Sequence, residues 1–166
     1  MTQYIVHIYR EMRLTFADID ARSEMTATGD AEPLMLLRAG TAAIARGIAR
    51  RAYEMAMEYA HARRQGGVAI IEHDAVNDML GAMAVRLAVP LPSTAGETQA
   101  LAAKIVQTDA AVATTTDAVQ VFGGTGYIRE TGVEKLMRDA KYCQLFPEPN
   151  WVAQDELMRL ERARRR

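Results

Sequence analysis

Cysteine, proline and aromatic residues are all scarce in this chain. Cys143 is the single cysteine among 166 residues, which excludes an intramolecular disulfide and fits a reducing compartment. Five prolines and an aromatic share of 6% argue against a loop-rich or disulfide-stapled scaffold. At this length a single domain buries a sizeable core without disulfides or metals.

The chain also lacks an excess of charge of either sign and any long apolar run. The formal net charge is −1, so composition gives no case for binding nucleic acid or a membrane surface. No apolar run approaches the length of a membrane span, and the first residues lack the apolar core of a signal peptide. His7, His61 and His73 have no acidic residue or cysteine at metal-ligand spacing. We therefore expect a cytoplasmic protein without a metal site.

What the chain does have is abundant alanine and methionine within a 49% hydrophobic composition, which favours helices. Apolar residues recur at helical spacing in five segments that begin or end at glycine or proline. The predicted helices are 33–65, 73–88, 97–120, 131–143 and 151–164. Short connections between them predict an all-α fold, an up-down bundle of four to five helices.

Residues 3–16 have a different pattern, the period-two alternation of a β-strand. We expect two parts, a strand remnant with a linker over 1–30 and a helical bundle over 31–166. A lone strand exposes unpaired backbone donors and acceptors, so this one needs a partner sheet.

Glycines cluster after the third predicted helix, in Phe122-Gly-Gly-Thr-Gly126. Such a cluster ends a helix, but it also lets backbone approach a phosphate, because glycine has no Cβ. Its neighbours are more specific: Gln120-Val-Phe precedes it, and Val133-Glu-Lys-Leu-Met-Arg-Asp-Ala-Lys141 follows it.

With Tyr59-Ala-His-Ala-Arg63-Arg-Gln65-Gly-Gly67 and Ile70-Ile-Glu-His73, these motifs resemble the C-terminal helical domain of acyl-CoA dehydrogenases. Members of that family are FAD enzymes that desaturate acyl-CoA thioesters. The resemblance covers most of this chain but less than half of a usual member. The N-terminal helical domain and nearly all of the β-domain are missing, and residues 13–19 resemble the last β-domain strand.

The resemblance implies a set of cofactor contacts. In the family this domain reaches the FAD of a neighbouring subunit, so Arg63 would lie on the flavin pyrophosphate, where a permanently charged planar guanidinium suits a diphosphate. The implied FAD-binding residues are Arg63, Gln65, Gln120, Gly123 and Gly124. The implied partners are a subunit carrying the missing domains, an acyl-CoA, and an electron-transfer flavoprotein or similar acceptor, all within an oligomer.

The chain departs from the family at the catalytic base. The glutamate expected in the loop before the last helix falls on Pro147, and the alternative position in the first long helix is Leu37. A shift of one residue would make Glu148 the base, between Pro147 and Pro149, which restrict the backbone. Two interpretations of Glu148 stay open, a solvated turn residue or a displaced base. Gly66 also replaces an aromatic residue of the pattern.

Three interpretations follow. The first is a subunit of a split, heteromeric, FAD-dependent acyl-CoA dehydrogenase that completes the FAD site and the oligomer interface. The second is a catalytically silent structural subunit with the family fold, which the missing base and Gly66 favour. The third is a truncated reading frame of an ordinary enzyme.

Overall fold

The computed structural model describes residues 33–90 and 96–165. The strand predicted over 3–16 lies outside these residues. The α-helices are α2 (Pro33–Ala62), α3 (Asp74–Ala88), α4 (Glu97–Phe122), α5 (Val133–Cys143) and α6 (Asn150–Arg164). Between them lie strands β1 (Arg64–Gln65) and β2 (Val68–Ala69) and the 3-10 turns η1 (Ile70–Glu72), η2 (Gly123–Tyr127) and η3 (Arg129–Thr131).

The helical bundle predicted from the sequence is confirmed, and local residues explain its boundaries. Gly132 has a left-handed backbone with φ of 76°, so α5 begins at Val133 and not at 131. The segment Gln65-Gly-Gly67 ends the first helix as predicted, but α2 stops at Ala62 because residues 64–69 form an antiparallel hairpin. Gly66 and Gly67, with φ of 64° and 89°, form its turn.

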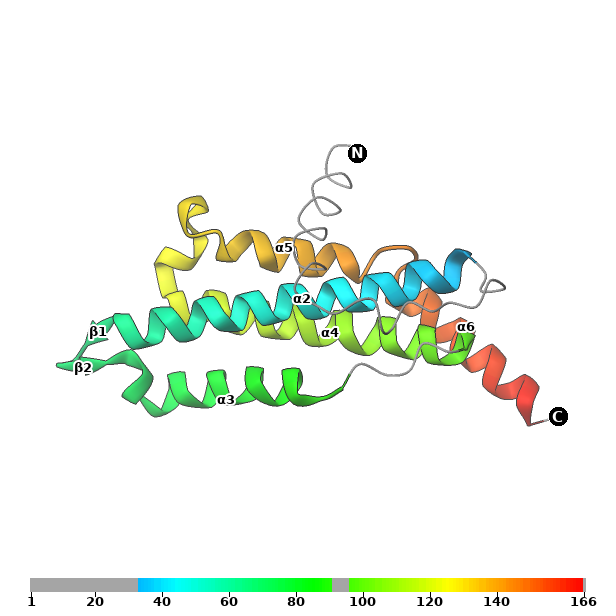
Figure 1. The fold of residues 1–166 in the computed structure, drawn as a ribbon, viewed down its shortest axis with the longest axis horizontal. Coiled ribbons are helices and arrows are strands. Elements are labelled where there is room, and N and C mark those ends of the chain that lie inside the picture. Colours follow the sequence, from blue (N-terminus) through cyan, green and yellow to red (C-terminus); the bar gives the residue numbers. More distant parts are fainter. Residues whose placement is uncertain (1–32, 91–95, 166) are drawn as a thin grey trace, which may run out of the picture.

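Helices α2 and α4 form the centre of the bundle and run in the same direction (Figure 1). Helices α3 and α5 run antiparallel to them, with α3 on one side of the central pair and α5 on the other. Helix α6 extends from the end of the bundle at which α2 and α4 begin, and packs against α4. No helix within the described ranges is long and apolar enough to cross a membrane.

Alanine, not the larger apolar residues, forms the buried face of α2. Large apolar residues recur along α2 at Leu37, Ile44 and Ile48, but Leu37 is 41% exposed and the two isoleucines are only partly buried. The buried positions of α2 instead include six alanines: Ala42, Ala45, Ala49, Ala52, Ala56 and Ala60. Small side chains let two helix axes approach closely, which explains why α2 and α4 share the most extensive contact in the bundle.

Candidate functional site

The residues implied to bind FAD gather at one end of the bundle, which we call the hairpin end: the C-terminus of α2, the β1–β2 hairpin, the C-terminus of α4 and η2. The ring of Tyr59 on α2 stacks on that of Phe122 on α4, with centroids 4.2 Å apart. The Tyr59 hydroxyl lies 3.3 Å from the Thr125 hydroxyl in η2. These contacts hold together segments that are more than fifty residues apart in the sequence.

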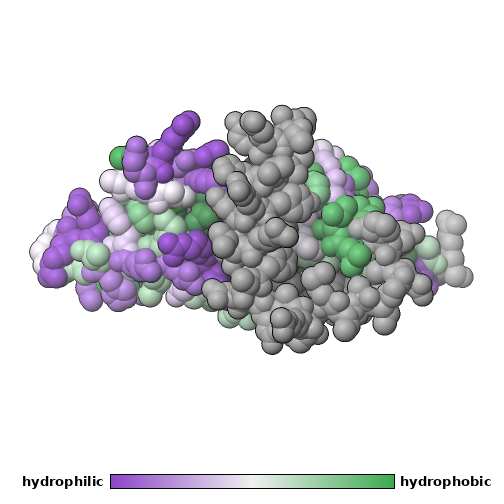
Figure 2. Space-filling model, turned by 45° about the horizontal axis from the view of Figure 1, so that its top comes forward, coloured by the Kyte–Doolittle hydropathy of each residue, from purple (hydrophilic) through white to green (hydrophobic). Residues whose placement is uncertain are grey.

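Arg63 follows α2 directly and is exposed, and its guanidinium has no partner among the described residues. Gln65 and Gln120 are exposed as well. Figure 2 shows hydrophilic residues covering the part of the surface around the hairpin. This end of the molecule therefore presents a permanent cation and amide groups to the outside.

The glycines after α4 fall into two kinds. Gly123 has φ of 61°, and a Cβ added at Gly123 or Gly124 would meet nothing within 4 Å. A Cβ at Gly126 would lie only 2.6 Å from the Val119 carbonyl oxygen. Gly126 is therefore required for packing, whereas Gly123 and Gly124 leave backbone open to an approaching group.

Gly66 stands where the family pattern has an aromatic residue, and its backbone conformation gives a local reason for a glycine. Its φ of 64° is left-handed, whereas a Cβ there would make only an ordinary contact, 3.6 Å from the imidazole of His73. The Nε2 atom of that histidine lies 3.1 Å from the Gln65 carbonyl oxygen, which accepts its hydrogen bond. His73 and the glycine turn together shape the loop that follows Arg63.

Glu148 lies near the opposite end of the bundle and is not a solvated turn residue. Its side chain is 15% exposed, and its Oε1 accepts a 2.9 Å hydrogen bond from Nε of Arg38, a side chain that is 6% exposed. The second carboxylate oxygen, Oε2, is buried and has no hydrogen-bond partner among the described residues. The solvated-turn interpretation is wrong because the loop folds back onto the first turns of α2. Arg38 also lies 3.5 Å from Glu97.

Lys104 is a site residue that the sequence reading missed. It is fully buried on α4, and its Nζ contacts the segment that carries Glu148. The available signal was a lysine between Leu101 and Ile105, both on the buried face of the same helix. A charged residue at such a position indicates a buried partner, because an unpaired ion does not stay in a core.

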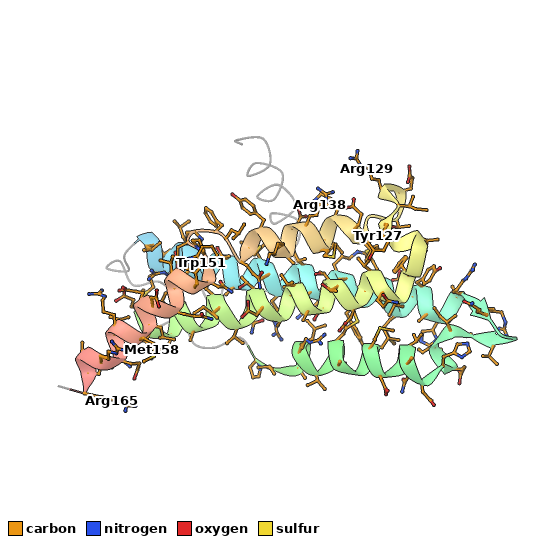
Figure 3. The ribbon with its side chains drawn as sticks, turned by 180° about the vertical axis from the view of Figure 1, so that it is seen from behind. Tyr127, Arg129, Arg138, Trp151, Met158 and Arg165 are labelled. Carbon is orange, nitrogen blue, oxygen red and sulfur yellow. The ribbon has the colours of Figure 1, made fainter. Side chains whose placement is uncertain are left out.

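The two sets of residues lie far apart. Arg38 lies in α2 and Arg63 directly follows its last residue, 25 positions further on, which at about 1.5 Å per residue separates them by about 38 Å. Figure 3 shows the same separation, with Tyr127 and Arg129 near the hairpin end and Trp151 and Met158 on α6 at the other. The Glu148 region and the hairpin end are therefore two separate sites.

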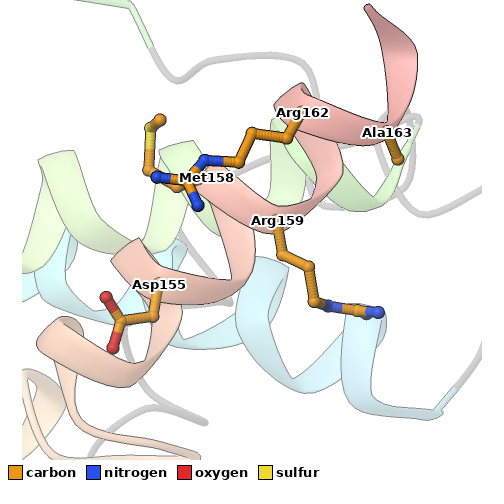
Figure 4. Close-up of a pocket in the computed structure, with 5 residues that line it drawn as sticks. All are labelled: Asp155, Met158, Arg159, Arg162 and Ala163. Atoms are coloured by element: carbon orange, nitrogen blue, oxygen red, sulfur yellow. The ribbon is translucent and has the colours of Figure 1, made fainter. Parts of the chain in front are cut away.

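The remaining candidates for a functional site, which are a cysteine, a metal cluster and a hollow on the surface, have less support. Burial raises the pKa of the Cys143 thiol to about 12, with the charge of Asp139 acting in the same direction, so it is a weak nucleophile. Within the described part of the chain, no three histidine, cysteine or acidic residues gather as metal ligands would. A hollow of about 650 Å³ lies along α6, lined by Asp155, Met158, Arg159, Arg162 and Ala163 (Figure 4). All five belong to one helix, and their polar groups converge on no common point.

Comparison with known proteins decides the family. Residues 30–147 match the family model of the acyl-CoA dehydrogenase C-terminal domain. This chain belongs to the acyl-CoA dehydrogenase family. The matched range ends at Pro147, the position at which this family member departs from the expected glutamate.

Curated relatives and solved structures agree with this assignment. The chain is 39% identical over 126 residues to an acyl-CoA dehydrogenase of Bacillus subtilis, covering 69% of this chain and 33% of that protein. It is 32% identical over 151 residues to 3-sulfinopropanoyl-CoA desulfinase of Paraburkholderia xenovorans, covering 79% and 39%. Butyryl-CoA dehydrogenase of Megasphaera elsdenii has a similar fold, with a TM-score of 0.64, 34% identity and coverage of 70% and 33%. The chain thus spans about a third of the length of the relatives it matches.

Proposed function

We propose that this chain is a subunit of a split, FAD-dependent acyl-CoA dehydrogenase, in which another polypeptide carries the N-terminal and β domains. The observation that carries the proposal is the Glu148 carboxylate, which has one oxygen held by Arg38 and the other buried without a partner among the described residues. A carboxylate oxygen without a protein partner needs an explanation, and we propose that this one acts on a ligand in the complete assembly.

The hairpin end fits FAD, judged by its own chemistry. A diphosphate needs fixed cationic donors and backbone that it can approach closely. Arg63 offers a guanidinium that has no partner among the residues the structure describes, and Gly123 and Gly124 offer open space where other residues would have a Cβ. Gln65 and Gln120 add exposed amides for the nucleotide. Because this end is remote from Glu148, we propose that it contacts an FAD shared with the partner subunit, across an oligomer interface.

At the other end, Glu148 is the proposed catalytic base. Arg38 holds Oε1, so Oε2, which is buried in this chain by itself, is the oxygen that would take the α-proton of an acyl-CoA thioester once the loop makes room for it in the assembly. FAD bound in the complete assembly would supply the acceptor for the hydride that leaves the β-carbon. This chain therefore supplies the proton acceptor and its orientation, and electrons leave through an electron-transfer flavoprotein or a similar acceptor.

A second function is a catalytically silent subunit that completes the oligomer. The observation that favours it is the Arg38–Glu148 ion pair itself, because a carboxylate paired with a buried guanidinium already has a structural role. The prolines on either side of Glu148 restrict how far its backbone moves toward a substrate.

Co-expression with a polypeptide that carries the missing domains tests the proposal. We expect a co-purified complex with a flavin absorbance spectrum that reduces an electron acceptor in the presence of an acyl-CoA. A complex that is colourless and takes up no added FAD would overturn the proposal. A yellow complex that turns over no acyl-CoA would instead support the silent subunit.

A further inference from the structure

Lys104 is a fully buried cation whose hydrogen bonds are all directed to one short segment of the chain. Its Nζ lies 3.2 Å from the Gln144 carbonyl oxygen, 2.5 Å from the Glu148 carbonyl oxygen and 2.6 Å from Oδ1 of Asn150. The three acceptors come from both ends of residues 144–150 and, at Glu148, from the residue proposed as the base. One side chain on α4 thus joins the start, the middle and the end of this loop.

The geometry requires the charged form of this lysine. An ammonium has three N–H donors, one for each of the three oxygens, whereas a neutral amine would turn a lone pair toward one of them. Burial lowers the pKa of Lys104, and the negative charges of Glu148 and Asp109 act in the opposite direction. The nearby carboxylates and the three acceptors therefore offset part of the desolvation of the cation, whose pKa stays below its usual value.

Asp109, also on α4, extends the network and bonds both Gln144 at the start of the loop and Asn150 at its end. Nδ2 of Asn150 donates to Oδ1 of Asp109 at 2.7 Å, and Nε2 of Gln144 donates to the same oxygen at 2.7 Å. The backbone N–H of Asn150 donates to the Gln144 carbonyl oxygen at 2.9 Å, which closes the loop on itself. The Glu148 side chain points out of this frame toward Arg38.

We propose that Lys104 is a positioning residue that fixes segment 144–150 on α4 and thereby sets the place of the Glu148 carboxylate beside Arg38. Lys104 contacts the backbone of Glu148, not its carboxylate, so it acts through the loop and not on a substrate. The consequence for turnover rests on the proposed function, whereas the consequence for the loop does not.

The first test uses the unaltered full chain with its lysine side chains labelled with 15N. The chain has only three lysines, and the other two, Lys135 and Lys141, are on the partly exposed helix α5. We expect one ζ-ammonium signal with slowly exchanging protons, which disappears in Lys104→Met. If all three groups exchange rapidly with water, the buried three-acceptor site does not exist and the proposal is overturned.

The second test is hydrogen exchange of backbone amides in Lys104→Met, with Arg86→Met as the matched control. Arg86 pairs with Asp117 between α3 and α4, so its replacement removes a cation, in this case a partly buried one, from a different contact of α4. We expect exchange of residues 144–153 to rise roughly tenfold or more in Lys104→Met and to stay unchanged in Arg86→Met. Unchanged protection in Lys104→Met, or equal loosening in both variants, would overturn the proposal.

Asn150→Ala covers the case in which Lys104→Met fails to fold. It keeps the lysine and its two carbonyl acceptors but removes the side chain that links the lysine to Asp109. A smaller rise in exchange, confined to the same residues, is expected. An exchange pattern like that of the unaltered chain would contradict the proposal.

Kinetics in the assembled complex form the third test. Lys104→Met should lower kcat for an acyl-CoA while the amount of bound FAD and KM change little, and Arg86→Met should leave kcat unchanged. Equal kcat in Lys104→Met and the unaltered complex would overturn the positioning role. An unaltered complex without turnover would count against the proposed function, and the exchange measurements would still decide the role of Lys104 in the loop.

Discussion

At the scale of single residues, two side chains carry the proposed functions of the chain. Glu148 has one carboxylate oxygen bonded to Arg38 and one buried oxygen without a partner among the described residues. Arg63 has an exposed guanidinium that likewise has no partner among the described residues. One residue is suited to take a proton, and the other to hold an anion.

Glu148→Gln separates the proposed base from a structural role. The amide keeps an oxygen that accepts the hydrogen bond from Arg38 but no longer takes a proton, so turnover in the complex should fall about 10²–10⁴-fold. Retained FAD, measured by flavin absorbance, should be unchanged. Glu97→Gln is the control, because Glu97 also lies beside Arg38 but is exposed. Turnover that survives in Glu148→Gln would exclude this carboxylate as the base.

Arg63→Ala tests the anion site at the hairpin end. Loss of a charge-assisted contact to a diphosphate should weaken FAD retention by roughly tenfold or more. The matched control is Arg50→Ala, which removes another exposed arginine, from the middle of α2. Dilution and ultrafiltration of the complex, followed by flavin absorbance, measures retention. The same FAD loss in both variants would show that Arg63 has no particular role.

At the scale of elements, the sequence predicted the existence and approximate ends of the helices but not which face of α2 is buried. Periodicity marks a helix wherever apolar residues recur, and glycine and proline mark its ends through the backbone alone. The choice between the alanines of α2 and its larger residues depends on how closely α4 approaches. That distance is a property of the packed pair and not of either segment.

Replacing either of two glycines by alanine should change the free energy of unfolding, but in opposite directions. Gly81 is exposed in the interior of α3, and an added Cβ would meet nothing, so Gly81→Ala should raise the free energy of unfolding by about 0.5–1 kcal/mol. Gly67 has φ of 89°, so Gly67→Ala should lower it by about 1–2 kcal/mol. Urea denaturation of the chain or its complex measures both. Changes of the same sign would contradict these backbone assignments.

At the scale of the whole molecule, the bundle places two sites about 38 Å apart, since α2 occupies nearly all of the 25 positions between Arg38 and Arg63. A single compact pocket cannot contain both ends. This separation is one physical reason to expect an oligomer, in which each end of the chain meets a different part of the assembly.

The buried thiol of Cys143 should make the free energy of unfolding of the whole molecule depend on pH. Burial raises the pKa of Cys143 from 9.0 to about 12, so above the lower value the unfolded chain loses a proton that the folded chain keeps. The contribution of this thiol to the free energy of unfolding is therefore fully present below pH 9. It is lost as pH rises from 9 toward 12, which lowers the free energy of unfolding by up to about 4 kcal/mol.

Cys143→Ala should remove this part of the alkaline decline, even though the small cavity it leaves lowers stability at every pH. The measurement is the free energy of unfolding against pH for the unaltered chain and the variant. Parallel curves above pH 9 would show that the thiol is not held in a buried, neutral state.

The sequence by itself determined the family, the helical bundle and the identity of the residues at the hairpin end. These depend on local patterns, because caps, glycine turns and helical periodicity act within a few residues of one another. The place of Glu148 was decided only by the tertiary structure, since Arg38 is 110 positions from it and Lys104 is 44. Burial removes water as an alternative partner for such groups, so the fold, and not the local sequence, made a loop glutamate a buried and oriented carboxylate.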